Sequence, residues 1–282
     1  MKDQGTMDQN TISSNEPYQR TYLFAHPQTA SNLLTKILNL EQQDVLPQTS
    51  NHTTPSSIQS GNIFKSPSWK VRSLQLYTSP ISSWTDAQIS DLSDCYQDSL
   101  SFFQHWLAKS EASGTKVFVK EHVICLTEPH HQAQFLAEKK KKQLRESCID
   151  PEIHRPSYDS FWMSLDKSPL NKTILTDEFL LSFQPTFLVR HPALVFPAYF
   201  KAHVDMFGYP GNEQETRELE IQFDGRMTFH WLRCLYDFYT TANSITTEPP
   251  VILDGDDVIT KPDVVTRYAE LVGFDPTKLR WE

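Results

Sequence analysis

The sequence predicts a single α/β domain in which helices cover both faces of a mainly parallel β-sheet, giving three layers. Four short runs of apolar, β-prone residues have the pattern of buried strands, at 20–25, 115–119, 187–189 and 250–253. Stretches with apolar residues at helical spacing lie among them, the clearest at 83–107 and 227–245. At 282 residues the chain is long enough for one such core, which we expect from residue 20 to residue 282.

Composition excludes several classes of function. The net charge of -9 argues against a nucleic-acid surface, which needs a basic face. No stretch approaches the ~20 apolar residues of a membrane span, and the polar residues 1–19 have no apolar segment of a secretory signal. We therefore expect a cytoplasmic protein with a flexible N-terminal arm and no membrane partner. The 4 Cys are scattered without metal-ligand spacing, so we predict reduced thiols and no metal. No oligomeric state is indicated.

The turn after the first predicted strand is a candidate anion site. It reads His26-Pro27-Gln28-Thr29-Ala30-Ser31-Asn32 and is followed by four leucines and one isoleucine at helical spacing. A helix that starts here directs free backbone N–H groups and the positive end of its dipole at the turn, which attracts phosphate, sulfate or carboxylate groups. The polar residues of the turn are the candidate ligands: Gln28, Thr29, Ser31 and Asn32.

The second predicted strand ends in Lys120-Glu121-His122. In an open α/β sheet, ligands bind at the carboxyl ends of the strands. A histidine with an ordinary pKa of about 6.5 can take and return a proton near neutral pH. We therefore predict that His122, with Lys120 and Glu121, transfers protons. The alternative is a surface cluster of ion pairs.

The third predicted strand is followed by Arg190, His191 and Pro192. Proline suits the first turn of a helix, and an arginine at a strand end can bind a phosphate or carboxylate through two hydrogen bonds. Arg190 is therefore a candidate anion ligand. The last strand leads into Asp254-Gly255-Asp256-Asp257, where three acids could bind a metal; we instead expect Asp256 or Asp257 to cap the next helix.

Three further segments carry weaker signals. Residues 40–68 are polar and rich in Ser, Thr and Pro, so they form either a solvated connection or a lid over the crevice. The lysine run 139–142 is typical of a solvated helix face, although with His130 and His131 before it an electropositive flap is an alternative. Residues 149–171 are rich in Pro and aromatic residues, which suits either irregular packing or the cover of an apolar pocket.

The order of these motifs resembles the sulfotransferase family, which uses phosphoadenosine phosphosulfate (PAPS). The resemblance spans residues 21–274. It implies that the turn at 26–32 holds the 5'-phosphosulfate, that Arg190 holds the 3'-phosphate, and that His122 is the general base for an acceptor hydroxyl. It also implies that residues 149–171 cover the acceptor pocket.

The chain departs from the family pattern at the positions that would hold PAPS. Gln28 stands at the place of a Lys or Arg, Ala30 at that of a glycine, Asn32 at that of a hydroxyl residue, and Ala198 at that of a serine. The basic, Gly-rich loop that the family places after the last helix is not seen after Gly273. Removal of one charge-stabilising donor from a preorganised site costs roughly 3 kcal/mol or more.

These departures favour an enzyme of small-molecule metabolism that uses no cofactor. It would act on a largely apolar substrate, of the kind found in secondary metabolism, by cyclisation, elimination or isomerisation. One alternative is a PAPS-dependent sulfotransferase of a small-molecule hydroxyl. Another is a ligand-binding or scaffold protein without catalytic activity.

Overall fold

The computed structural model describes residues 20–47, 62–78, 81–144, 167–242 and 250–281. The predicted N-terminal arm, the middle of the possible lid and most of the segment 149–171 lie outside these residues. Among the described helices, none is both long and apolar enough to cross a membrane.

The four predicted strands are confirmed and form one parallel sheet. They are β1 (Arg20–Ala25), β2 (Val117–His122), β3 (Gln184–Val189) and β4 (Val251–Asp254), in the spatial order β2-β1-β3-β4. At the carboxyl edge, Ala25 pairs with His122 and with Leu188, and Val189 pairs with Asp254. The register therefore brings the motifs that follow all four strands to the same edge of the sheet.

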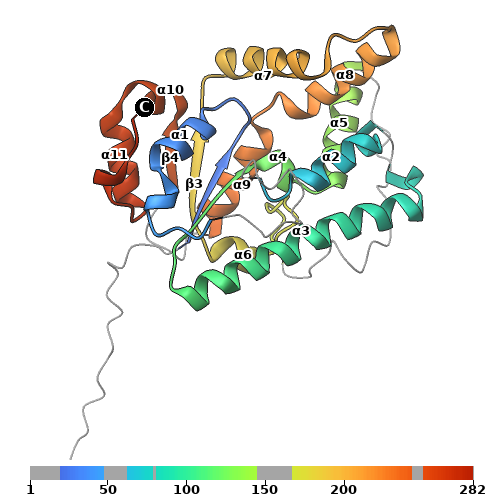
Figure 1. The fold of residues 1–282 in the computed structure, drawn as a ribbon. Coiled ribbons are helices and arrows are strands. Elements are labelled where there is room, and N and C mark those ends of the chain that lie inside the picture. Colours follow the sequence, from blue (N-terminus) through green and yellow to red (C-terminus); the bar gives the residue numbers. More distant parts are fainter. Residues whose placement is uncertain (1–19, 48–61, 79–80, 145–166, 243–249, 282) are drawn as a thin grey trace, which may run out of the picture.

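Helices cover both faces of the sheet, so the predicted three-layer arrangement is confirmed (Figure 1). One face carries α1 (Ser31–Leu38), α10 (Gly255–Thr260) and α11 (Pro262–Leu271). The other carries α3 (Asp86–Ser113), α4 (Val123–Leu126), α6 (Asp177–Leu181) and α9 (His230–Ala242). Strand β1 supplies both cores because its side chains alternate: Tyr22 and Phe24 enter the α3 side, and Leu23 enters the α1 side.

Four more helices lie beyond the carboxyl edge on the α3 side: α2 (Lys65–Ser73), α5 (Pro129–Leu144), α7 (Pro192–Phe207) and α8 (Glu213–Arg226). Short 3-10 turns at Leu40–Gln42, Leu76–Thr78, Ile81–Ser83 and Pro276–Lys278 complete the described elements. The expectation of an unstructured segment up to residue 68 is wrong for its last part, because α2 begins at Lys65. Ile63 and Phe64 are fully buried there and anchor the start of the helix.

Local signals explain where the long helix α3 begins and ends. Thr85 accepts a hydrogen bond from the backbone of Gln88, and the Gln88 side chain accepts one from the backbone of Thr85, which is a capping box. The helix continues past the predicted end at residue 107 and stops at Gly114, whose φ of 64° is easily adopted only without a side chain. The predicted helix start at Pro192 is also confirmed.

Candidate active site

The turn between β1 and α1 keeps the backbone shape of an anion-binding loop although it has no glycine. Gln28 and Ala30 have φ angles of 69° and 68°, in the left-handed region that a glycine occupies without strain. For alanine this conformation costs roughly 1–2 kcal/mol. The buried Thr29 hydroxyl donates a 2.7 Å hydrogen bond to the carbonyl of His26 and holds the turn closed. Alanine at position 30 therefore strains the loop without abolishing its shape.

The N-terminus of α1 is open to an anion. Its N-cap residue, Ala30, makes no side-chain hydrogen bond to the helix, and the first turn contains no acidic residue. The helix bonds begin with the amide of Leu34, which donates to the carbonyl of Ala30 at 3.0 Å. The leading amides, with the buried Ser31 and the exposed Asn32 and Gln28 beside them, can therefore bind a negatively charged group.

Lys120 brings a cation to this helix N-terminus from the neighbouring strand. Its ammonium group donates a 3.1 Å hydrogen bond to Oδ1 of Asn32, although the two residues are 88 positions apart in sequence. Lys120 is only 4% exposed, and burial lowers its pKa from the ordinary value. Lys120, on β2, thus places near α1 the positive charge that the uncharged Gln28 does not provide.

Glu121 leaves β2 on the opposite face from Lys120. Its carboxyl group accepts hydrogen bonds from the backbone amides of Phe64 at 3.0 Å and of His122 at 3.1 Å. It is fully buried, and burial raises its pKa to about 8. Alternation along the strand separates Glu121 from the α1 side, so the predicted trio of Lys120, Glu121 and His122 does not form one compact group. Glu121 ties the chain before α2 to the sheet.

His122 stands at the carboxyl end of β2 with a partly exposed side chain. Burial, followed by the charges of Lys120 and His26, holds the pKa of His122 well below its usual value of 6.5. Its ring has no hydrogen-bond partner among the residues that the structure describes. The imidazole is therefore neutral at physiological pH and can accept a proton.

His26 is a site residue that sequence reasoning missed. Its Nδ1 lies 2.7 Å from the carbonyl oxygen of Pro27, and its Nε2 lies 2.6 Å from that of Arg226. The ring also packs against Phe196, Tyr199 and Phe229. Burial lowers its pKa, and a neutral imidazole carries one N–H, so it donates to one carbonyl at a time. His26 joins the loop to the end of α8, and its place at the first position of the turn was the available signal.

Gly255 is the second site residue that the sequence analysis missed. Its role is visible only from the carbonyl group of Thr29, which lies beside it in the folded chain. A Cβ at this position would lie 2.5 Å from the carbonyl oxygen of Thr29 and 3.3 Å from Cδ of Arg190. The start of α10 can therefore approach the loop only without a side chain at this position. A glycine directly after a buried strand, in a chain with only 8 glycines, was the signal in the sequence.

Arg190 lies at the end of β3 as predicted, and one edge of its guanidinium is already used. Its Nε donates a 2.9 Å hydrogen bond to Oδ1 of Asp256, while its terminal nitrogens have no partner among the described residues. The predicted capping role of Asp256 or Asp257 is wrong. Asp254 caps α10, Asp256 pairs with Arg190, and Lys261 is the N-cap residue of α11.

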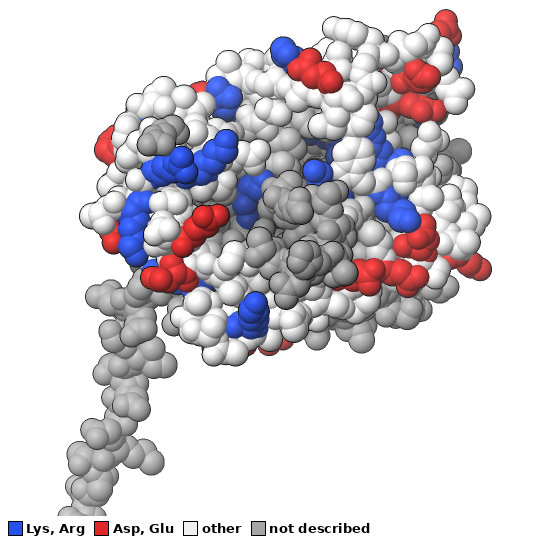
Figure 2. All heavy atoms as spheres, in the orientation of Figure 1, with Lys and Arg blue, Asp and Glu red and all other residues white. Residues whose placement is uncertain are grey.

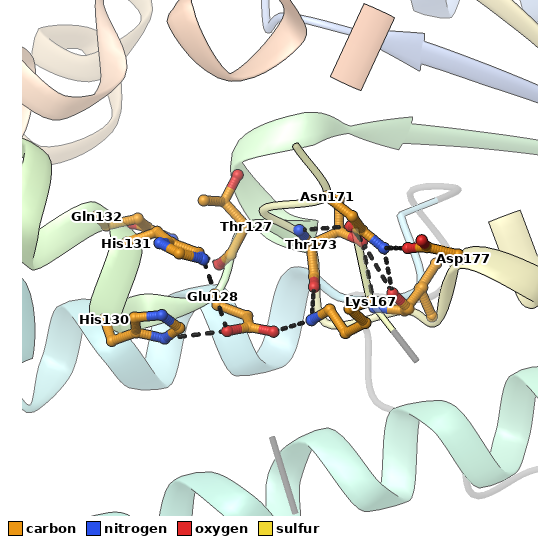
Figure 3. Close-up of polar contacts among 10 residues, drawn as sticks. Thr127, Glu128, His130, His131, Gln132, Lys167, Asn171, Thr173 and Asp177 are labelled. Carbon is orange, nitrogen blue, oxygen red and sulfur yellow. Dashed lines mark hydrogen bonds and ion pairs between the residues drawn. The ribbon is translucent and has the colours of Figure 1, made fainter. Parts of the chain in front are cut away.

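A second polar cluster lies past α4, where Glu128 gathers two histidines and a lysine (Figure 3). Its Oε2 lies 3.0 Å from Nδ1 of His130 and 4.0 Å from Nε2 of His131, and its Oε1 accepts from the ammonium of Lys167. Within the described parts of the chain, this is the one group of three side chains close enough to hold a metal ion. Lys167 already neutralises the buried carboxylate and also donates to the carbonyl of Thr173. We therefore interpret the cluster as a structural ion pair.

Basic and acidic side chains are both present on the face shown in Figure 2. Several Lys and Arg side chains lie toward its middle, with Asp and Glu side chains beside them and toward the rim.

Comparison with known proteins finds two curated relatives that have the same name. It is 33% identical over 267 residues to "Sulfotransferase ppzF" of Metarhizium majus (strain ARSEF 297), covering 92% of this chain and 73% of the relative. The identity to "Sulfotransferase ppzF" of Metarhizium rileyi (strain RCEF 4871) is also 33% over 267 residues, with 92% and 72% covered. No family model matches the chain. No solved structure matches it either.

Proposed function

This chain belongs to the sulfotransferase family, and we propose that it transfers a sulfuryl group from PAPS to a hydroxyl of a small-molecule acceptor. This is the alternative that the sequence left open, and it replaces the cofactor-free enzyme as the leading hypothesis. The names of the relatives support it, and so does the geometry of the loop. Membership of the family does not by itself specify the acceptor.

The observation that carries the proposal is the contact between Lys120 and Asn32. It places an ammonium group within 3.1 Å of the first turn of α1, where the uncapped amides already attract negative charge. Ala30 keeps the left-handed conformation that such a loop needs. Lys120 would therefore supply the charge that Gln28 lacks, and Ala30 keeps the loop shape at a cost in strain.

The residues present fit PAPS at both of its charged ends. The α1 amides and Lys120 would hold the phosphosulfate, and the terminal nitrogens of Arg190 would hold the 3'-phosphate. When bound, PAPS supplies a sulfuryl group attached to a phosphate leaving group. The charge of Lys120 would stabilise the negative charge that develops on the leaving oxygen. Neutral His122 would accept the proton of the acceptor hydroxyl as the new O–S bond forms.

A cofactor-free reaction remains a second candidate because of Gln28. This exposed residue carries no charge at the place where the family uses a cation. In that case the α1 amides would hold an anionic or carbonyl oxygen of the substrate, and His122 would move protons within it. The same experiment separates the two candidates.

The test is a thermal-shift titration with adenosine 3',5'-bisphosphate, the desulfated product of PAPS. A ligand at 100 times its Kd stabilises the folded state by about 2.7 kcal/mol, which raises Tm by roughly 5–10 °C for a chain of this size. Lys120→Met should reduce the shift, whereas Lys36→Met, which removes an exposed lysine from the last turn of the same helix, should keep it. No shift in the unmodified protein would reject the proposal and favour the cofactor-free reaction.

A second variant tests the proton acceptor. His122→Ala should keep the shift with the bisphosphate and lose sulfuryl transfer, because the side chain serves the acceptor hydroxyl and not the nucleotide. Transfer at the unmodified rate in this variant would remove the role assigned to His122.

A further inference from the structure

Two arginines from distant parts of the chain, Arg72 and Arg226, lie where α2, α7 and α8 meet. Arg72 is on α2, with its Cζ 4.3 Å from the ring centre of Phe207 and 5.2 Å from that of Trp69. Arg226 ends α8, with its Nη2 3.5 Å from the hydroxyl of Ser68 on α2. The junction of α2, α7 and α8 therefore determines where both guanidinium groups lie.

Neither arginine has an acidic partner within the part of the chain that the structure describes. The ion pairs between described residues involve other side chains, and both arginines are absent from them. The polar groups that contact or face Arg226 include hydroxyls and a thiol, from Ser68, Tyr77, Cys125 and Tyr199. The charge of Arg226 also acts on three histidines, His26, His122 and His203. Burial raises the pKa of Tyr77 to about 12, so its hydroxyl is neutral. Two partly buried cations thus lie among mainly neutral polar groups, with Glu218 as an acidic group whose charge acts on Tyr77.

Such an arrangement is costly unless an anion completes it. Buried or half-buried charges in proteins are normally paired, because desolvation penalises an isolated charge. Burial and the charge of Arg226 both lower the pKa of Arg72, whereas the pKa of Arg226 is raised, because Tyr199, Cys125 and Tyr77 outweigh the effect of burial. Stacking on Phe207 and Trp69 orients Arg72, but it does not neutralise the charge.

The position of the two arginines relative to the candidate phosphosulfate site and His122 indicates which ligand they bind. The candidate phosphosulfate site is on the α1 side, where Lys120 contacts Asn32. Arg226 is on the α2 and α8 side, and its carbonyl contacts His26 at the start of the loop. Ala25, directly before His26, pairs with His122 in the sheet, so the end of α8 also lies near the carboxyl end of β2. The charges of both Lys120 and Arg226 lower the pKa of His122. A ligand at the arginine pair therefore lies on the acceptor's side of His122.

We propose that the acceptor is an anionic hydroxy compound, such as a hydroxycarboxylic acid, whose carboxylate is bound by Arg226 and Arg72 while its hydroxyl faces His122. This substrate class rests on the proposed sulfuryl transfer. The anion-binding role of the two arginines does not, because it can be measured without the nucleotide. Guanidinium groups bind carboxylates through paired hydrogen bonds, and the Ser68 and Tyr199 hydroxyls beside Arg226 can support the same anion.

The experiment compares acids with their methyl esters, which have the same shape but no charge. The probes are 4-hydroxyphenylacetate and 12-hydroxydodecanoate, each with its ester, titrated by calorimetry into the protein without nucleotide. A charge-assisted hydrogen bond is worth enough for at least one acid to bind on the order of tenfold tighter than its ester. Arg226→Met and Arg72→Met should each bring this ratio close to one. Arg217→Met, which removes an exposed arginine of α8, should leave it unchanged.

Each outcome decides the proposal. An acid preference that persists in both Arg226→Met and Arg72→Met, or that disappears in Arg217→Met, overturns it. So does a protein that binds neither acid better than its ester. The thermal shift with adenosine 3',5'-bisphosphate, recorded on the same variants, shows that they are folded and keeps the two proposals apart. A lost shift with an intact acid preference rejects sulfuryl transfer, whereas an intact shift without acid preference rejects the anionic acceptor.

Discussion

Replacement of Gly255 by alanine tests whether the close contact between α10 and the loop maintains the candidate nucleotide site. The added Cβ would lie 2.5 Å from the carbonyl oxygen of Thr29 and 3.2 Å from its carbonyl carbon. These are backbone atoms, so no flexible side chain can move aside. The loop or the start of α10 must shift by about half an ångström or more to restore a normal contact distance.

The expected losses follow from this shift. Overpacking of a close contact costs typically 1–3 kcal/mol, and each kcal/mol lowers Tm by roughly 2–4 °C in a chain of this size, so Gly255→Ala should lower Tm by roughly 2–12 °C. Activity should fall further, because a displacement of about 1 Å in a catalytic group can reduce a rate by about 100-fold. The bisphosphate thermal shift should shrink as well, since the α1 amides move with Thr29.

The measurements are a melting curve, the bisphosphate titration and the transfer rate, each compared with Gly211→Ala. In that control the added Cβ meets only Oε2 of Glu215, at an ordinary 3.5 Å. Alanine there should leave Tm unchanged or slightly higher, because it restricts the unfolded chain. If Gly255→Ala melts and binds the bisphosphate like the unmodified protein, the contact does not constrain the loop and the reasoning is refuted.

Three other changes have defined outcomes. Ala30→Gly should raise the free energy of unfolding by about 0.5–1 kcal/mol in urea titrations, because it removes left-handed strain of roughly 1–2 kcal/mol and adds a smaller entropy to the unfolded chain; a decrease would mean that the Ala30 methyl group makes stabilising contacts. The transfer rate should stay level as the pH falls from 7.5 to 6.5, because the pKa of His122 is held well below 6.5; a twofold loss already at pH 6.5 would contradict that shift. The pKa of His203 is lowered from 6.5 to about 4, mainly by burial and then by Arg72 and Arg226, so the unfolded state binds the proton more readily and stability is lost as the pH falls from 6.5 to about 4. His203→Gln should flatten this part of the stability profile, and an unchanged slope would exclude His203 as its source.

The sequence predicted the sheet and its carboxyl edge correctly because both depend on local signals. Buried parallel strands have continuous apolar runs, and the residues just after each run mark the edge. The turn at 26–32, the position of His122 and the Arg190 to Pro192 unit could all be placed in this way. Alternation along β2 also indicates that Glu121 points away from Lys120, so the prediction that Lys120, Glu121 and His122 act together did not use all of the local signal.

Interactions between distant residues were not predictable from single motifs. Position 28 was correctly identified as lacking a charge, but the ammonium group that reaches α1 comes from Lys120, on another strand. The same holds for Gly255, whose small size matters only because the carbonyl of Thr29 lies beside it. The pairing of Arg190 with Asp256 likewise replaced the predicted helix cap.

By itself, the amino-acid order determined which segments are strands, where they end and which reactive side chains stand at those ends, since hydrophobic periodicity and turn chemistry act over a few residues. Only the tertiary structure decided which charges are compensated and which have no partner among the described residues. Electrostatic energy depends on distance in space and on burial, and the folded chain sets both for Arg226, Arg72 and Lys120.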